Sequence, residues 1–340
     1  MIRKLTLALL VTGTACGGTT STGEVNVYSH RHYEADQQIF DQFESETGIS
    51  VNVVTGSADE LITRLEQEGR NSPADILITV DAGRLHRAWE KGLLRRTQSP
   101  TLDSLVPGHL RDPEGYWFGL TRRARVIVYA RDRVQPSDLS TYEALASDTW
   151  RNRVLIRSSD NVYNQSLLAS IIATAGPERA QEWAEGIVHN MARSPSGGDT
   201  DQAKAVAAGV GDVAVVNTYY VARLIDSEDP EERRVGSALG VFFPNQGDGE
   251  RGTHVNVSGA GVTTHAPNAA NAVRLLEFLA SPAAQRVFAE ANKEYPVTAG
   301  VQPAATLLEW GEFRSDTLNL ARLGQLNAEA VRILDRAGWP

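Results

Sequence analysis

The 340-residue sequence contains one cysteine, so the chain forms no internal disulfide bond and must take its stability from a buried core. Basic residues are not in excess. The formal net charge is −9, which argues against nucleic acid as a partner, because phosphate binding needs a basic surface. The HExxH, GxSxG, P-loop and CxxC motifs are absent. These absences predict an acidic protein that is not an enzyme and does not bind nucleic acid.

The first residues have the pattern of an export signal. Arg3 and Lys4 precede a short apolar segment, which falls well below the roughly 20 residues of a membrane span. We therefore expect residues 1–15 to be a signal peptide and residues 16–23 a flexible tether. Cys16 is the first residue after the predicted signal peptide and resembles the lipid-attachment cysteine of bacterial lipoproteins. The alternative is ordinary signal cleavage beside an incidental cysteine. The predicted location is the periplasm or the outer face of the membrane, anchored through Cys16.

Strand-like and helix-like segments alternate in the first part of the mature chain. Strand patterns at 25–29, 49–54 and 74–80 are separated by helix patterns at 34–47 and from Ser57. The run 74–80 is continuously apolar, as expected for a strand that is covered on both faces. This β-α-β-α-β order predicts a parallel sheet with helices on both sides.

The same order returns later, which predicts a second α/β lobe. The segments that carry it are strands 153–156 and 212–216, and helices from Asn164, at 177–190 and from Thr218. A further strand at 254–264 and an amphipathic helix at 268–279 follow. Two apolar stretches are candidate crossing strands, 122–131 outward and 240–246 in return. We predict two doubly wound α/β domains joined by crossing hinge strands. The N-lobe is expected at 24–121 plus 247–292, and the C-lobe at 122–246 plus 293–340.

Four of the nine tyrosines follow directly after predicted strands. Tyr33 comes after the first strand, Tyr163 after strand 153–156, and Tyr219 and Tyr220 after strand 212–216. In a doubly wound fold these strand-to-helix junctions face the ligand crevice. Simple aromatic packing is the alternative, but two adjacent tyrosines cannot both face one core and both lie at such a junction. The pattern therefore predicts a ligand that several phenols can hold.

Phenol chemistry favours a hard, highly charged cation. A phenol has a pKa of about 10, and a bound metal displaces its proton. Phenolate oxygen is a hard anionic donor that suits Fe³⁺, whereas divalent or softer metals prefer imidazole, thiolate or carboxylate. Three phenolates would neutralise Fe³⁺ and a fourth would leave one negative charge, which a nearby cation would offset. Fe²⁺ stays open as the working ion, with a different number of protons.

Two other functions compete with this interpretation. A binding protein of the same fold could hold an organic anion, a phosphonate or a polyamine, with the tyrosines stacking on the ligand. A zinc hydrolase could use the histidines of "HRH" (30–32) with Glu34 and Asp36. The hydrolase would need further His, Asp or Glu ligands at later strand ends, where this sequence has tyrosine.

Six segments form a specific set: "YSHRHYEAD", "SPADILITVD", "WFGLTRRARVIVY", "SSDNVYNQS", "NTYYVARL" and "FFPNQGDGERGTHVNVSG". Together they resemble the periplasmic ferric-iron-binding proteins of bacterial ABC transporters, in the branch with a tyrosine-rich site typified by cyanobacterial iron-uptake proteins. The resemblance covers the chain from about Val25 to its end. It implies the two-lobed, type II periplasmic-binding-protein fold, reversible capture of Fe³⁺ by a monomer, and delivery to an ABC permease with its ATPase.

The resemblance also assigns roles to single residues. Tyr33, Tyr163, Tyr219 and Tyr220 match the metal ligands of the family. His32 matches a histidine that coordinates weakly in some members and stands off in others. A further match is Arg123, which corresponds to an arginine that offsets surplus phenolate charge or holds a synergistic carbonate or other small anion.

Overall fold

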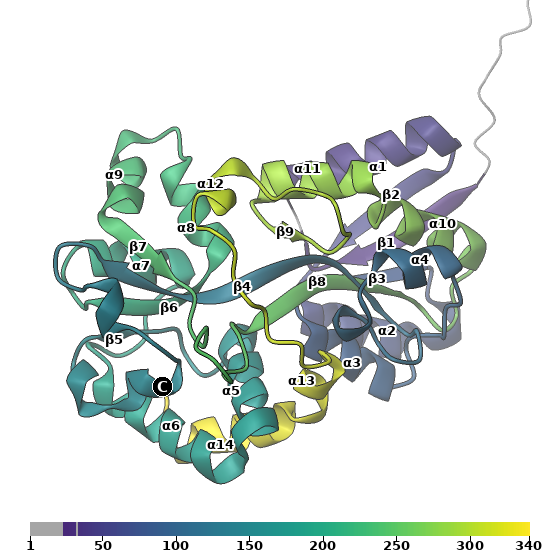
Figure 1. Ribbon diagram of the computed structural model, residues 1–340. Helices are drawn as coiled ribbons and strands as arrows, with labels where there is room; N and C mark the ends of the chain where they lie inside the picture. Colours follow the sequence, from purple (N-terminus) through teal and green to yellow (C-terminus); the bar gives the residue numbers. More distant parts are fainter. Residues whose placement is uncertain (1–22, 32) are drawn as a thin grey trace, which may run out of the picture.

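The computed structural model describes residues 23–31 and 33–340 (Figure 1). The predicted signal peptide, Cys16 and nearly all of the predicted tether lie outside the described residues, as does His32. Within the described part of the chain, no helix has both the length and the apolar character needed to cross a membrane.

The first sheet is built on the predicted parallel strands. β1 (Glu24–Ser29) lies between β2 (Ser50–Thr55) and β3 (Ile76–Thr79), and both pairings are parallel. β8 (Val255–Val262) joins β3 in the antiparallel direction. The β-α-β-α-β order therefore gives the parallel sheet that the sequence predicts, and a late strand from far along the chain extends it.

One long strand joins the two halves of the molecule. β4 (Phe118–Ala130) crosses the middle of the structure in Figure 1. Its first half pairs with β8, and its second half pairs with β6 (Val213–Asn217). β6 in turn holds β5 (Val154–Leu155) in parallel, which gives the order β2-β1-β3-β8-β4-β6-β5. The predicted crossing strand at 122–131 is confirmed, and it starts several residues earlier than expected.

The prediction of a return crossing strand at 240–246 is wrong. β7 (Leu239–Phe242) is a short strand that pairs with the second half of β4, inside the second sheet. The chain then forms a loop, and β8 is the strand that runs alongside the first half of β4. The apolar "GVFF" run indicates a strand correctly, but periodicity cannot distinguish an edge strand within one lobe from a strand that connects two.

Helices cover both faces of each sheet. Those of the first sheet are α1 (Glu34–Thr47), α2 (Ala58–Glu68), α3 (Ala82–Glu90), α4 (Pro100–Leu105), α10 (Ala269–Leu279) and α11 (Pro282–Asn292). Figure 1 shows α1, α10 and α11 on one face and α2 and α3 on the other. Those of the second sheet are α5 (Val162–Ala175), α6 (Pro177–Asn190), α7 (Asp199–Ala207), α8 (Thr218–Ile225) and α9 (Pro230–Ala238).

The helix boundaries follow from local sequence signals. Ser57 accepts a hydrogen bond from the backbone N–H of Glu60, and the Glu60 side chain accepts one from the N–H of Ser57, so the predicted capping box opens α2. Gly48 ends α1 with a φ of 70°, a left-handed conformation that glycine adopts without steric cost. Short 3₁₀ turns fill several connections, at 69–71, 108–110, 136–138, 143–146 and 148–150.

The last part of the chain connects the two sheets. β9 (Tyr295–Pro296) pairs with β4 at Thr121 and Arg122, and α12 (Ala305–Leu308) packs on α8. α13 (Ala321–Gln325) contacts both α3 and α5, and α14 (Asn327–Arg336) packs on α5 and α6. The C-terminal segment thus touches helices of both halves.

Candidate metal centre

The structure brings three of the predicted tyrosines together at helix starts. Tyr163 lies in the first turn of α5, and Tyr219 and Tyr220 lie in the first turn of α8. The phenol oxygens of Tyr163 and Tyr219 are 3.2 Å apart and share a hydrogen bond. The rings of Tyr219 and Tyr220 are 4.2 Å apart between centroids. Three phenols therefore converge where two strands of the second sheet give way to helices.

Tyr33 reaches the same place from the first sheet. It immediately precedes α1, shortly after the end of β1. The guanidinium of Arg223 lies 4.7 Å from the ring centroid of Tyr33 and 5.1 Å from that of Tyr219, so one cation bridges the two rings. Burial raises the pKa of Tyr33 and Glu294 adds to it, while the guanidinium groups of Arg31 and Arg223 oppose the shift.

Burial makes the phenols hard to ionise without a cation. Burial is the largest cause that raises the pKa of Tyr163 and of Tyr219, and the neighbouring phenol of Tyr220 raises both further. Tyr219 is 2% exposed. The phenols are therefore neutral near pH 7, and a bound trivalent cation would supply the charge that ionises them.

Arg123 lies beside the tyrosines, as predicted. Its guanidinium is 5.3 Å from the ring centroid of Tyr163, and Arg125 and Arg157 approach the same ring at 5.6 Å each. One amino group of Arg123 donates to the carbonyl of Val80. The other is buried without a hydrogen-bond partner among the described residues. That unsatisfied donor fits the predicted role in holding a small anion or offsetting phenolate charge.

Sequence reasoning missed Arg31, which stands inside the "HRHY" segment. Its guanidinium is buried, pairs with Asp36 and Glu294 at 3.0 Å each, and lies 5.0 Å from the ring centroid of Tyr33. These two carboxylates are far apart in the sequence, so their convergence on one arginine gives no local signal. Arg31 fixes the turn that carries Tyr33 between β1 and α1.

A single buried carboxylate organises the other side of the site. Asp199, at the start of α7, accepts hydrogen bonds at 2.8 Å from the Arg125 guanidinium and from the backbone N–H of Asn217. Asn217 is the residue before α8, and Arg125 also donates to Asn164 of α5 at 2.8 Å. Asp199 therefore holds in register the two helix starts that carry the tyrosines.

The geometry does not favour the two competing functions. Within residues 23–31 and 33–340, no three or more His, Cys, Asp or Glu side chains gather where they could hold a metal ion, as a zinc hydrolase would require. The hollow lined by Tyr163, Arg123, Arg125 and His254 is too narrow to admit a water molecule. Organic ligands usually occupy pockets of roughly 300–1,000 Å³, so this hollow has no room for one.

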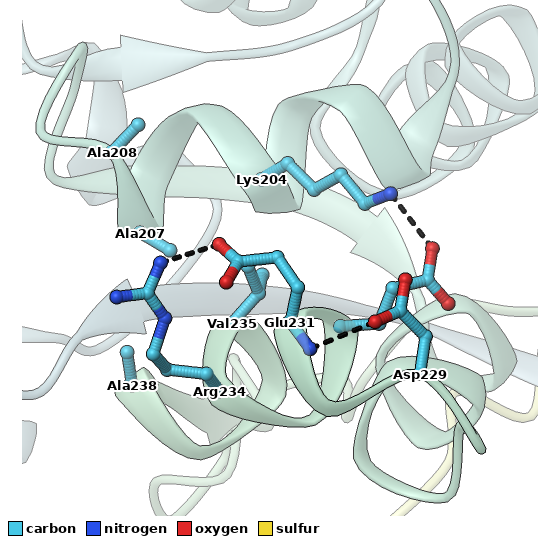
Figure 2. A pocket seen from close by; sticks show the side chains of 9 residues that line it. Lys204, Ala207, Ala208, Asp229, Glu231, Arg234, Val235 and Ala238 are labelled. Atoms are coloured by element: carbon cyan, nitrogen blue, oxygen red, sulfur yellow. Dashed lines mark hydrogen bonds and ion pairs between the residues drawn. The ribbon is translucent and has the colours of Figure 1, made fainter.

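A larger groove lies elsewhere on the surface, between α7 and α9 (Figure 2). Its volume is about 530 Å³. Two ion pairs line it, Lys204 with Glu232 at 2.8 Å and Arg234 with Glu231 at 2.5 Å, and Asp229 accepts a hydrogen bond from the backbone N–H of Glu231. No tyrosine lines this groove, so it is not a second site of the same kind.

The buried imidazole of His254 predicts that the fold loses stability in acid. Burial lowers the pKa of His254 well below its ordinary value of about 6.5, and three guanidinium groups add to the effect, those of Arg251, Arg125 and Arg123. Below pH 6.5 the unfolded chain binds a proton that the folded chain does not. The stability from this group is therefore full above pH 6.5 and falls by up to about 1.4 kcal/mol per pH unit below it.

Urea unfolding at pH 7.5 and 5.5 checks this prediction. The wild-type protein is expected to lose about 1.4 kcal/mol more than His254→Gln between the two pH values. Equal losses in the two proteins would show that His254 does not titrate differently on unfolding.

Comparison with known proteins gives consistent matches over nearly the whole chain. A family model described as bacterial extracellular solute-binding protein matches residues 38–314. Iron uptake protein A1 of Synechocystis is 52% identical over 316 residues, which cover 93% of this chain and 87% of that protein. The major ferric iron-binding protein of Neisseria meningitidis is 25% identical over 99% of this chain and 98% of its own length.

Solved structures agree with the fold. A structure of Trichodesmium IdiA (FutA) in complex with iron and citrate ligands matches with a TM-score of 0.91 and 52% identity, over 94% of this chain and all of that one. The ferric binding protein of Campylobacter jejuni matches with a TM-score of 0.88 and 41% identity, over 93% of this chain and all of that one. The predicted two-lobed α/β fold of type II is thereby confirmed.

Proposed function

The chain belongs to the bacterial extracellular solute-binding proteins, and we propose that the solute it captures is ferric iron. The observation that carries the proposal is the convergence of Tyr163, Tyr219 and Tyr220 from the second sheet with Tyr33 from the first, which the guanidinium of Arg223 joins to Tyr219. Several phenols at one point suit Fe³⁺ better than any other common solute. The relatives named for iron uptake and ferric iron binding support the same solute.

The proposed ligands are the oxygens of the four tyrosines, Tyr33, Tyr163, Tyr219 and Tyr220. Three phenolates neutralise Fe³⁺ and the fourth leaves one negative charge, which the guanidinium of Arg123 offsets. The unsatisfied amino group of Arg123 also suits a small synergistic anion such as carbonate. The structure of a similar protein with iron and citrate supports an anion beside the metal. His32 is proposed to complete or border the shell.

The four tyrosines come from two proposed lobes, so movement of the lobes can release the iron. Tyr33 belongs to the proposed N-lobe, and the other three belong to the proposed C-lobe. Separation of the lobes about β4 and β8 would remove Tyr33 from the metal and leave a partial set of ligands. Arg223, which bridges Tyr33 and Tyr219, would lose one of its two aromatic partners in the same movement.

The proposed partner is the permease of an ABC importer with its ATPase, to which the protein delivers iron without catalysing a reaction. The family description places such proteins outside the cell. We propose that this chain is exported, acts as a monomer and is anchored by a lipid on Cys16. Mass spectrometry of the membrane-associated protein would test the anchor: a mature chain that starts at another residue, without acyl groups, would contradict it.

The tyrosine oxygens are expected to select iron over zinc. After exposure to equal concentrations of ferric citrate and zinc, the purified protein is expected to retain about one iron per chain and little zinc, because phenolates prefer the harder cation. Elemental analysis by plasma mass spectrometry after gel filtration gives both ratios. Retention of zinc in preference to iron would contradict the proposal.

Acid is expected to favour release of the iron. Since burial raises the pKa of Tyr163 and of Tyr219, each phenol must lose a proton when it binds the metal, and protons compete for the same oxygens. The apparent affinity for Fe³⁺ is therefore expected to fall by at least about tenfold per pH unit on acidification. Competition against a chelator of known proton affinity at pH 8 and pH 6 measures this slope. An affinity that does not change with pH would mean that no phenol proton is displaced.

A further inference from the structure

The segment "SPADILITVD" ends at Asp81, a buried residue of the first half of the molecule that contacts the helix carrying Tyr163. Asp81 follows β3 and directly precedes α3. Its carboxylate accepts a hydrogen bond from the hydroxyl group of Ser166 at 2.8 Å, and both side chains are buried. Ser166 lies in α5 three residues after Tyr163, so the two residues share one face of that helix. One hydrogen bond therefore joins the first sheet to the part of α5 that carries a proposed ligand.

The same turn of the chain also contacts Arg123, which lies beside the ring of Tyr163. The carbonyl of Val80 accepts a hydrogen bond from the guanidinium of Arg123, whose distance from the Tyr163 ring centroid is 5.3 Å. Asn256 of β8 pairs with Arg123 of β4 in the sheet, and its amide group donates to Asp81 at 2.7 Å. The turn after β3 thus holds both the helix of Tyr163 and the arginine beside its ring.

Capping of α3 does not by itself account for a carboxylate at this position. Asp81 accepts a hydrogen bond from the backbone N–H of Arg84 at 3.2 Å, which caps the start of the helix, but serine and asparagine cap helices about as well and carry no charge. A buried charge is costly unless a cation pairs with it. No Lys, Arg or His in the described part of the chain forms an ion pair with Asp81, and the guanidinium of Arg84 pairs with Asp59 instead, at 3.1 Å. What the charge adds is a stronger hydrogen bond from Ser166 than a neutral acceptor would give.

The first turn of α3 leaves room for this carboxylate. Gly83 occupies a position where a Cβ atom would lie 2.8 Å from a carboxylate oxygen of Asp81, closer than such atoms approach in proteins. Glycine is a poor helix former, so its place in the first turn favours the carboxylate over the stability of the helix. The local sequence of the turn, "DAG", therefore fits a carboxylate that is held toward Ser166.

We propose that Asp81 is a positioning residue for Tyr163 and acts through Ser166. This inference rests on the proposed capture of iron. The hydrogen bond from Ser166 fixes the rotation of the first turns of α5 relative to the first sheet, from which Tyr33 comes. The phenol oxygen of Tyr163 is thereby held where it can bind the metal together with a ligand from the other half of the molecule. Asp81 is not itself proposed as a ligand.

Ser166→Ala tests the proposal, because it removes only the hydroxyl group and leaves Asp81 its bonds to Asn256 and to α3. The affinity for Fe³⁺ is expected to fall by about tenfold or more, since groups that orient metal ligands commonly contribute about 10- to 100-fold. Ser237→Ala is the control: this exposed serine of α9 donates to the carbonyl of Arg233 at 2.8 Å, and unchanged affinity is expected. Citrate competition, followed by the visible absorbance of the iron complex, measures both affinities.

A second substitution separates positioning of Tyr163 from a general structural effect. In the Tyr163→Phe protein the oxygen that Ser166 is proposed to position is absent, so adding Ser166→Ala is expected to change iron affinity by less than about twofold. Asp81→Asn weakens the same hydrogen bond from its other end, and adding Ser166→Ala to it is expected to cost little more than Asp81→Asn alone. Equal losses from Ser166→Ala with and without the Tyr163 hydroxyl group would overturn the proposal.

The wild-type protein distinguishes failure of the positioning role from failure of the proposed function. A wild-type protein that binds no Fe³⁺ would contradict the function itself. If the wild-type protein binds Fe³⁺ and Ser166→Ala binds it equally well, only the positioning role of Asp81 is refuted.

Discussion

Replacing Tyr219 and Tyr220 together with phenylalanine is expected to abolish measurable binding of Fe³⁺ while the protein stays folded. The two rings pack at 4.2 Å, and phenylalanine keeps that packing because only the hydroxyl groups are lost. Two of the four proposed ligand oxygens disappear at the same time. The hydrogen bond between Tyr219 and Tyr163 also disappears, so the remaining phenol loses its orientation.

The expected loss of iron affinity is large because these oxygens are proposed to bind the metal directly. Substitutions of groups that only orient metal ligands commonly cost 10- to 100-fold in metal affinity. A direct ligand should therefore cost at least about 100-fold, and two together at least about 10,000-fold. Competition with citrate, followed by the visible absorbance of the iron complex, measures these losses.

A tyrosine outside the proposed site provides a matched control, because its substitution removes a hydroxyl group that does not bind the metal. Tyr116→Phe changes a tyrosine that packs on Trp89 at 5.8 Å, away from the proposed site, and is expected to leave iron affinity unchanged. Full affinity in the Tyr219→Phe/Tyr220→Phe protein would remove both residues from the set of ligands. The metal would then bind elsewhere in the protein.

Replacing Asp199 with asparagine is expected to lower the free energy of unfolding by about 3–5 kcal/mol. This carboxylate is fully buried and pairs with Arg125 at 2.8 Å, and Arg157 lies 3.7 Å away. Asparagine has nearly the same shape but leaves the Arg125 guanidinium buried without a countercharge. Removal of one partner from a buried ion pair usually costs this amount.

The same change is expected to weaken iron binding by about 10- to 100-fold, because Asp199 also holds the N–H of Asn217 at the start of α8. Urea unfolding of the metal-free protein gives the stability, and citrate competition gives the affinity. Asp132→Asn is the control: its side chain is 74% exposed and pairs with Arg133 on the surface, so a loss below about 1 kcal/mol is expected. Similar losses in both variants would mean that Asp199 does not organise the site.

Much of the fold could be predicted from the sequence because its signals are local. The apolar run of β3, the glycine at the end of α1 and the capping box of α2 each depend on a few neighbouring residues. The four candidate tyrosines could be found for the same reason, since each lies at the start of a helix that follows a strand along the chain. The return crossing was wrongly placed at 240–246 because strand pairing, unlike strand formation, depends on residues far along the chain.

The supporting residues of the site could not be predicted for a similar reason. Arg31 meets Glu294 across 263 positions of the chain, and Asp199 meets Arg125 across 74. Arg223 lies four residues after Tyr219, yet its contact with Tyr33 exists only when the two halves fold together. Nothing in the local pattern of these charged residues distinguishes them from residues on a solvated surface.

The most direct test of the proposed ligands is a visible absorption spectrum of the purified mature protein, titrated with ferric citrate under oxidising conditions. Charge transfer from tyrosinate to iron is expected to give a broad band in the region of about 450–500 nm, which saturates near one iron per chain. The band is expected to be lost in Tyr219→Phe/Tyr220→Phe and kept in Tyr116→Phe. A wild-type protein that stays colourless at every iron concentration would contradict capture of Fe³⁺ by these tyrosines.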